Sequence, residues 1–205
     1  MKSTIQSRII LIVCTTLLTH ISICQTASLT REERFKKLES KMIFPLIKGG
    51  YMCGVIPVDN ITSKPGTHID IKLIFDFTQT TSKDNQAKKI NEGLEEVARI
   101  LNLHIASGVK KTKLKSVIIF HSGSIISILN NEFYQQNYKS NNPNVDMLKQ
   151  LSSAGVEMVI CGQSLALRNV PHSMLLPDVK IALAAKTTLS KYQSQGYIAF
   201  EIKTE

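Results

Sequence analysis

The segment VEMVICGQSLALRN, residues 156–169, contains the side chain with the most reactive chemistry in this chain. An apolar run predicts a strand that ends at Cys161, and Gly162 and a helix-forming segment follow. A thiol at such a junction faces the positive end of a helix dipole and unpaired backbone N–H groups, which favour the nucleophilic thiolate. The pattern is equally compatible with Cys161 as a small, buried apolar residue. Cys161 is therefore a candidate catalytic thiol with a structural alternative.

Polar residues also follow two other predicted strands. In an open parallel sheet, ligands bind in the crevice beyond the carboxyl ends of the strands. His121, near the end of the second strand, is a candidate general base or thiolate partner, or a hydrogen-bonded residue at the sheet edge. If the three strands are neighbours, an acid, an imidazole and a thiol share one rim. The residues predicted to line this crevice are Asp76, Thr78, Gly123, Gly162, Gln163 and Ser164.

Strands and helices alternate along the chain with short connections. Strands are predicted at 68–77, 114–123, 156–161, 179–185 and 197–202, and helical segments at 85–107, 124–130, 143–155, 163–169 and 187–195. Such alternation predicts βαβ units, and right-handed crossovers place helices on both faces. The predicted fold class is α/β, a three-layer sandwich with a mostly parallel sheet of about five strands. The sequence does not give the order of the strands.

The N-terminus has the features of a secretory signal peptide, residues 1–24. A basic start precedes an apolar stretch, and cleavage is predicted before Gln25. Retention and acylation of Cys24 is the alternative, disfavoured because Ile23 is large for that processing site. The mature protein is therefore expected to be periplasmic or secreted, with no later segment near the ~20 apolar residues of a membrane span. Residues 25–67 form a predicted extension with a short helix at 31–42, and residues 68–205 form the α/β domain.

Charge and cysteine content exclude several classes of function. The formal net charge is +9, but the one lysine cluster, residues 110–115, lacks the aromatic and Arg partners of a nucleic-acid surface. After cleavage, Cys53 and Cys161 remain, and Cys53 is a candidate resolving thiol if the extension folds over the crevice. Without a CxxC motif or a nearby His pair, a metal site is not predicted. No cofactor is predicted either, because GxGxxG and Walker A motifs are absent.

An ordered set of segments resembles the DsrE/DsrF-like family. The segments are KLIFDFTQ, VIIFHSG, LKQLSSAGVEMVICGQSLALRNV and LPDVKIALAAKTTLSKYQSQGYIAFEI, spanning about residues 69–202. The resemblance, closest to small stand-alone members, implies a compact sandwich of DsrE-like/flavodoxin-like topology that assembles as a trimer or hexamer. In sulfur-relay members a cysteine accepts a sulfane sulfur as a persulfide and passes it on. Cys161 matches that cysteine by its position at a strand end.

Two functional hypotheses follow. The first is an exported DsrE-like sulfur carrier, similar to a sulfurtransferase, in which Cys161 exchanges sulfur with a thiol-bearing donor or acceptor and His121 assists. The alternative is a non-catalytic oligomeric module, either binding a small ligand or purely structural, in which Cys161 is packed. The outward apolar positions of the last two strands and the segment SIISIL are the predicted subunit contacts.

Overall fold

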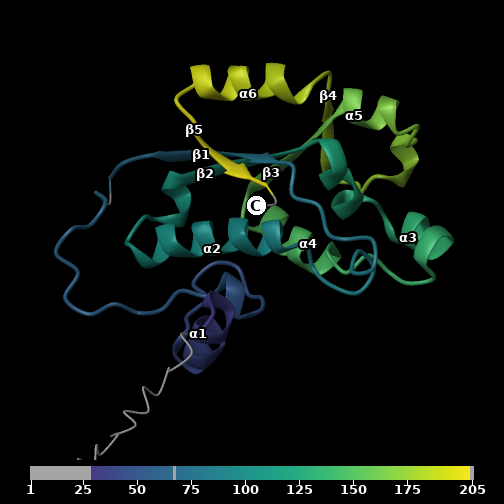
Figure 1. Cartoon of the computed structure of the whole chain (residues 1–205). Helices are drawn as coiled ribbons and strands as arrows, with labels where there is room; N and C mark the ends of the chain where they lie inside the picture. The colour runs from purple at the N-terminus through teal and green to yellow at the C-terminus, as the bar shows by residue number, and fades with distance from the viewer. Residues whose placement is uncertain (1–28, 67, 204–205) are drawn as a thin grey trace, which may run out of the picture.

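A computed structural model describes residues 29–66 and 68–203, and the predicted signal peptide with its cleavage site lies outside them. Within these residues, five strands form one sheet in the order β4-β3-β2-β1-β5 (Figure 1). Every neighbouring pair is parallel. The strands are β1 (Ile71–Phe77), β2 (Leu114–Phe120), β3 (Val156–Cys161), β4 (Val179–Ala182) and β5 (Ile198–Ile202). The predicted α/β class with a parallel sheet is confirmed.

The strand order explains which helix covers which face. The chain moves in one direction from β1 to β4, so right-handed crossovers put α2 (Glu92–Ala106) and α4 (Val145–Ser153) on the same face. The return from β4 to β5 runs the opposite way and puts α6 (Ala185–Ser194) on the other face. Figure 1 shows α6 above the sheet and α2 and α4 below it. The structure is therefore the predicted three-layer sandwich.

Two apolar cores of unequal size lie on the two faces of the sheet. The larger one, between the sheet and α2 and α4, contains Phe75, Phe77 and Phe120, each 0% exposed. The smaller one lies under α6 and contains Ile119 and Cys161. Side chains alternate between the two faces of a strand, so sequence parity decides to which core a strand residue belongs.

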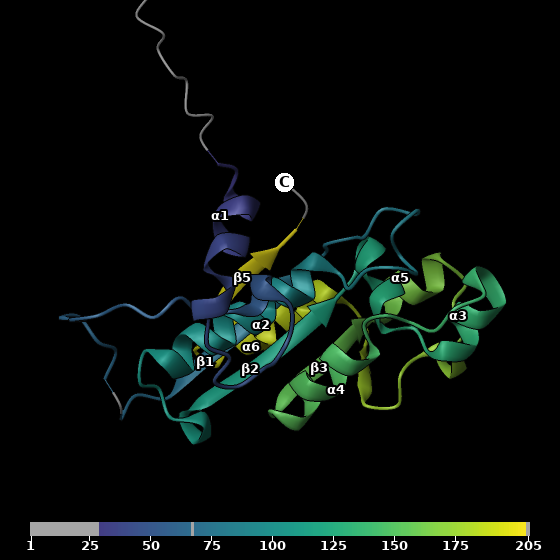
Figure 2. The ribbon, with the colours of Figure 1, turned by 90° about the horizontal axis from the view of Figure 1, so that it is seen from below.

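The N-terminal extension packs beneath α2 (Figure 2). Its helix α1 (Arg31–Leu38) is followed by two single turns, η1 (Glu39–Lys41) and η2 (Tyr51–Cys53), and η2 contacts α2. The buried Asn102 of α2 anchors this segment, because its carboxamide accepts from the backbone N–H groups of Leu46 and Ile47 at 2.9 Å and donates to two carbonyls. The extension therefore lies on the same side of the sheet as α2, opposite α6.

The predicted strands 114–123 and 179–185 end earlier, at Phe120 and Ala182, and the helix predicted at 31–42 ends at Leu38. Three further differences are larger. Helix α2 begins at Glu92 rather than residue 85, because the Asn91 side chain caps it by accepting from the Gly93 N–H at 2.8 Å. The polar segment after SIISIL contains a helix, α3 (Asn131–Tyr138). SIISIL itself belongs to the 3₁₀ segment η4 (Ser122–Ile128), and its Ile125 and Ile128 lie in the core rather than facing outward. None of the helices in the described residues is long and apolar enough to cross a membrane.

Candidate functional site

The strand order brings Asp76, His121 and Cys161 to one rim of the sheet. Strands β1, β2 and β3 are consecutive neighbours, and each of these residues lies at or just after the carboxyl end of its strand. Because Phe120 pairs with Ile160, His121 and Cys161 follow at the same level. Asp76 pairs with Ile119, whose side chain faces α6, and His121 lies two residues after Ile119. Cys161 is itself in the core under α6, so all three side chains lie on the α6 face. Two of them, Asp76 and His121, are bonded directly.

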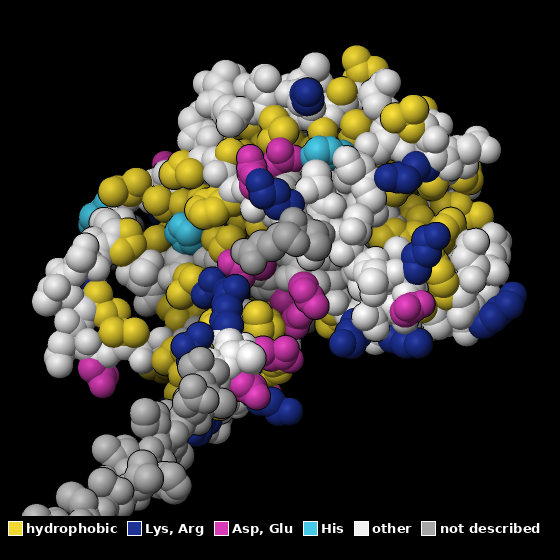
Figure 3. Space-filling model, viewed as in Figure 1, with side chains coloured by type: hydrophobic (Ala, Val, Ile, Leu, Met, Phe, Trp, Pro, Cys, Tyr) yellow, Lys and Arg dark blue, Asp and Glu magenta, His cyan; other side chains and the backbone are white. Residues whose placement is uncertain are grey.

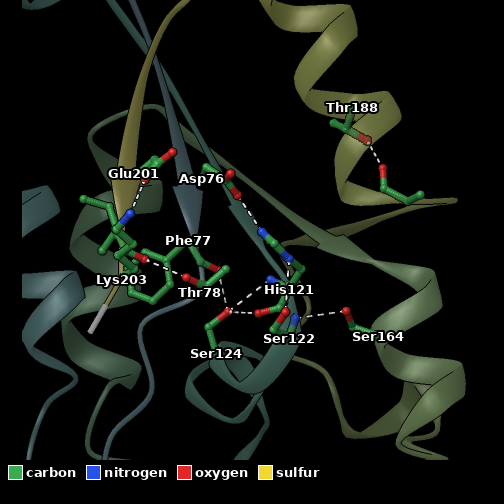
Figure 4. A network of polar contacts seen from close by, with 12 residues as sticks. Asp76, Phe77, Thr78, His121, Ser122, Ser124, Ser164, Thr188, Glu201 and Lys203 are labelled. Carbon is green, nitrogen blue, oxygen red and sulfur yellow. Dashed lines mark hydrogen bonds and ion pairs between the residues drawn. The ribbon is translucent and has the colours of Figure 1, made fainter. Parts of the chain in front are cut away.

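His121 and Asp76 form a half-buried hydrogen-bonded pair. His121 Nε2 lies 2.5 Å from Asp76 Oδ1, and the other ring nitrogen, Nδ1, lies 3.3 Å from the Ser122 hydroxyl. Figure 4 shows the imidazole between these two partners. Both ring nitrogens are therefore occupied, and among the described residues neither bonds to the sulfur of Cys161. Asp76 on β1 therefore orients the imidazole, which follows the strand next to that of Cys161.

Cys161 lies where the chain connections of neighbouring strands diverge. Strand β3 continues into α5 (Gly162–Leu167), whose Leu165 packs in the larger core, whereas β4 leads to α6 on the opposite face. A sheet of this kind binds ligands at such a switch point. Helix α5 begins directly after Cys161, and the backbone N–H of Ala185, at the start of α6, lowers the pKa of the Cys161 thiol. The N-termini of both helices therefore adjoin the thiol.

The polar groups around Cys161 lower the pKa of its thiol by more than burial raises it. Burial alone would raise the pKa of the Cys161 thiol, but hydrogen bonds from the Ser164 hydroxyl and from the backbone N–H groups of Ser164, Ala185 and Gln163 lower this pKa below its ordinary value. These donors stabilise the thiolate, which is the reactive form. The site is thus built for an anion at the sulfur position.

A hydrogen bond links the turn after His121 to Ser164, whose hydroxyl lowers the pKa of the Cys161 thiol. The Ser122 N–H donates to Ser164 Oγ at 3.0 Å, as Figure 4 shows, which leaves the Ser164 proton for the sulfur. Ser122 has a φ of +58°, a left-handed conformation that is costly for a residue with a side chain. Its carbonyl accepts from Nε of Arg168 at 3.0 Å. These bonds hold the turn in the conformation that directs the Ser122 N–H to Ser164.

Gly162 and Gln163 join the start of α5 to the loop after β4. The backbone N–H of Gln163 donates to the Leu183 carbonyl at 3.2 Å. A Cβ on Gly162 would lie 2.8 Å from the Ala182 carbonyl oxygen, so glycine is required for this approach. The two residues act through their backbone and hold the two helix N-termini together.

The structure places the remaining predicted residues away from the sulfur. The Thr78 N–H and hydroxyl both bond to the Ile202 carbonyl of β5, which lies three strands from β3. Gly123 packs against Thr80 on the loop after β1. Sequence reasoning missed Ala185 and Arg168. Ala185 acts through its backbone N–H, which has no sequence signature, and Arg168 acts through a bond that depends on the tertiary structure.

Cys53 is not brought to this rim. It is a free thiol, 0% exposed, in the larger core on the opposite face of the sheet, because the extension packs on α2 instead of folding over the crevice. Burial, together with Glu95 and Glu96, raises the pKa of the Cys53 thiol to about 12. Among the described residues, no group of three or more His, Cys, Asp or Glu side chains is placed to hold a metal ion.

The fold and this rim define a parallel α/β protein with a thiol at its topological switch point. The chain belongs to the DsrE/DsrF-like family, whose family model matches residues 72–201. A search of the curated proteins finds no match.

Two solved structures are similar to this chain. MTH1491 of Methanobacterium thermoautotrophicum, a protein of unknown function, has 13% sequence identity and a TM-score of 0.47, over 64% of this chain and 99% of that chain. The YchN protein of E. coli has 12% identity and a TM-score of 0.39, over 65% and 99%. The family assignment rests on the match of the family model.

Proposed function

We propose that this protein is a thiol-based sulfur carrier in which Cys161 accepts a sulfane sulfur as a persulfide. One observation carries the proposal: Cys161 lies between two helix N-termini, where hydrogen-bond donors lower the pKa of its thiol despite burial. Membership of the DsrE/DsrF-like family supports it. A packed structural cysteine needs none of these donors.

The sulfur transfer consists of two displacements. The Cys161 thiolate attacks the outer sulfur of thiosulfate, forming a new S–S bond while the bond to the sulfonate sulfur breaks and sulfite leaves with its electron pair. An acceptor thiolate then attacks the terminal sulfur of the protonated persulfide, and Cys161 leaves as the thiolate. Neither step requires an external oxidant or reductant.

His121 is assigned a supporting role in this scheme. Its bond to Asp76 on β1 fixes the imidazole on the same face of the sheet as Cys161. The pair therefore fixes the rim next to the thiol, while the Ser164 hydroxyl and the backbone N–H groups stabilise the sulfur anion.

The limited exposure of Cys161 restricts the donor to a small molecule. The residue is 5% exposed, so an extended cysteine persulfide on a protein surface has little access to its sulfur. A sulfane compound of the size of thiosulfate or a short polysulfide fits this restriction. The acceptor is then either equally small, or it attacks the terminal sulfur of the persulfide, which lies one S–S bond further out than the Cys161 sulfur.

Intact mass spectrometry tests the proposal directly. After incubation with thiosulfate or polysulfide, the wild-type protein is expected to gain about 32 Da per sulfur atom, reversibly with dithiothreitol. Cys161→Ser should show no gain, whereas Cys53→Ser should behave as the wild type. If the wild type gains no mass and Cys161 also resists iodoacetamide in the folded protein, the carrier function is wrong and a binding or structural module remains.

Export and self-assembly are part of the same proposal. The N-terminal sequence supports export, and N-terminal sequencing of protein recovered outside the cytoplasm should begin at Gln25. The exposed apolar side chains of the edge strands and their flanks, Ile181, Leu183 and Ile198, support assembly into a homo-oligomer. Light scattering that finds a monomer at micromolar concentration would contradict the assembly.

A further inference from the structure

A groove of about 790 Å³ lies beside the thiol site, below α5. Its walls come from the loop after β1, from η4 and α3, and from the segment that follows α5. In the view of Figure 3, hydrophobic side chains lie in a hollow between α5 and α3, with Lys or Arg side chains at its borders. A volume of this size is in the range of sites for small organic ligands. Of the groove residues, only Arg168 has a role in the thiol site described above, through its bond to the Ser122 carbonyl.

The floor of the groove is apolar, whereas hydroxyl groups line its rim. The floor is formed by Ile125, Ile126, Leu129, Phe133 and Val170, and the rim by Thr80, Thr81 and Ser82. Leu167 at the edge is 87% exposed, although it is a large apolar side chain. Exposed apolar surface next to a concave apolar floor gains free energy when an apolar ligand covers it. The shape and composition thus favour a ligand with an apolar body.

The charged residues of the groove are both cations. Lys83 and Arg168 line it, and no carboxylate does. Arg168 donates through Nε to the Ser122 carbonyl at 3.0 Å, which holds its guanidinium at the wall. In the part of the chain that the structure describes, neither cation forms an ion pair. Two cations without counter-charges, next to hydroxyl donors, complement an anionic group.

Gly123 shows how closely the groove wall is packed. A Cβ at this position would lie 2.2 Å from Cγ2 of Thr80, so the loop after β1 approaches η4 as closely as only glycine permits. Both residues line the groove. The wall with the rim hydroxyls is therefore held against the apolar floor in the free protein. Binding of a ligand then requires little rearrangement of this wall.

We infer that this groove binds a small organic anion with an apolar body, such as a medium-chain carboxylate or sulfonate. The apolar body lies on the floor formed by η4 and α3, and the acidic group lies between Lys83 and Arg168. The inference does not rest on sulfur transfer at Cys161, because the groove residues do not include the thiol or its hydrogen-bond donors, and only Arg168 contacts the turn that leads to them.

Titration calorimetry with decanoate and decyl sulfonate, each below its micellar concentration, tests the inference on the full-length mature protein. Both anions should bind with one site per chain, and neutral decanol should bind about tenfold more weakly, because it lacks the charge-assisted hydrogen bonds. The double variant Lys83→Gln/Arg168→Gln should lose about tenfold in affinity for the anions and keep its affinity for decanol. Lys186→Gln, an exposed lysine on α6, is the matched control and should bind as the wild type.

A second variant locates the apolar body. Ile126→Glu places a carboxylate on the half-buried floor and should abolish binding of decanoate and decanol alike, while circular dichroism checks that the fold is retained. The inference is wrong if the wild type binds neither anion, or if the double variant binds decanoate as tightly as the wild type. Sulfur uptake by Cys161 in the mass assay should be unchanged in the single variant Lys83→Gln, which weakens anion binding but keeps the Arg168 bond to the Ser122 turn, and this separates the test from that of the carrier function.

Discussion

Cys161 and Cys53 are two free, buried thiols whose surroundings have opposite effects on their chemistry. Cys161 is 5% exposed and Cys53 is 0% exposed, so burial barely distinguishes them. Yet hydrogen-bond donors lower the pKa of Cys161 below its ordinary value, whereas burial and two nearby glutamates raise the pKa of Cys53 to about 12. The number and direction of polar groups at the sulfur, rather than burial, separate a reactive thiol from a packed one.

The surroundings of Cys53 are those of a packing residue. Its sulfur lies where a Cβ on Gly49 would be only 2.6 Å away, so the extension closes tightly over it. Its carbonyl accepts from Nδ2 of Asn102 at 2.9 Å. This thiol therefore contributes volume and one backbone contact, which fixes the extension on α2 rather than over the crevice.

The largest expected effect is the difference in alkylation rate between the two thiols. In the native protein at neutral pH, iodoacetamide should modify Cys161 roughly a thousandfold faster than Cys53, because the thiolate is the reacting form and its fraction follows the pKa. Quantitative peptide mass spectrometry over time measures both rates in one sample. If iodoacetamide modifies both thiols at equal rates, and only after unfolding in urea, then Cys161 is no more reactive than Cys53.

The next effect concerns the residue that holds the extension in place. Asn102→Ala removes the partners of two backbone N–H groups and two carbonyls and should lower the free energy of unfolding by roughly 3 kcal/mol. Urea denaturation measures the change, and alkylation of Cys53 should accelerate in the same variant as the extension loosens.

The matched control for Asn102 is Asn137→Ala on α3, which loses one exposed hydrogen bond to the Phe133 carbonyl. It should change stability by no more than about 0.5 kcal/mol. If Asn102→Ala is equally mild and leaves Cys53 protected, the extension is held by apolar packing alone.

The smallest expected effect concerns the Ser164 hydroxyl. For wild-type Cys161, the alkylation rate should rise with pH to a midpoint below that of a free thiol, because the donors around the sulfur lower the pKa of Cys161. Ser164→Ala removes a donor that lowers the pKa of Cys161, so the midpoint should move to higher pH and the rate at neutral pH should fall about fivefold.

Ser190→Ala, which loses a bond to the Lys186 carbonyl on the exposed side of α6, serves as the control and should leave the profile unchanged. A wild-type midpoint at or above that of a free thiol would show that the donors around Cys161 do not outweigh its burial.

Much of the fold and part of the site follow from local patterns in the sequence. The alternation of apolar strands with helices predicted the parallel α/β sandwich because each pattern reflects the local period of side-chain burial. The predicted start of α2 at residue 85 was wrong, because Asn91 caps the helix and α2 begins at Glu92. The backbone N–H of Asn91 donates to Oδ1 of Asn144 at 2.7 Å, which holds the cap in place. That bond joins segments far apart in the chain, so no local pattern records it.

The sequence by itself determined that Cys161 ends a buried strand and begins a helix, and that Asp76 and His121 lie at the ends of two other strands. Only the tertiary structure decided that these strands are neighbours, that the N-terminus of α6 reaches Cys161 through Ala185, and that the extension buries Cys53 on the opposite face. Local patterns fix where elements begin and end and which side chains face a core. Strand order and backbone contacts arise from packing between distant segments, and backbone N–H groups are the same in every residue except proline.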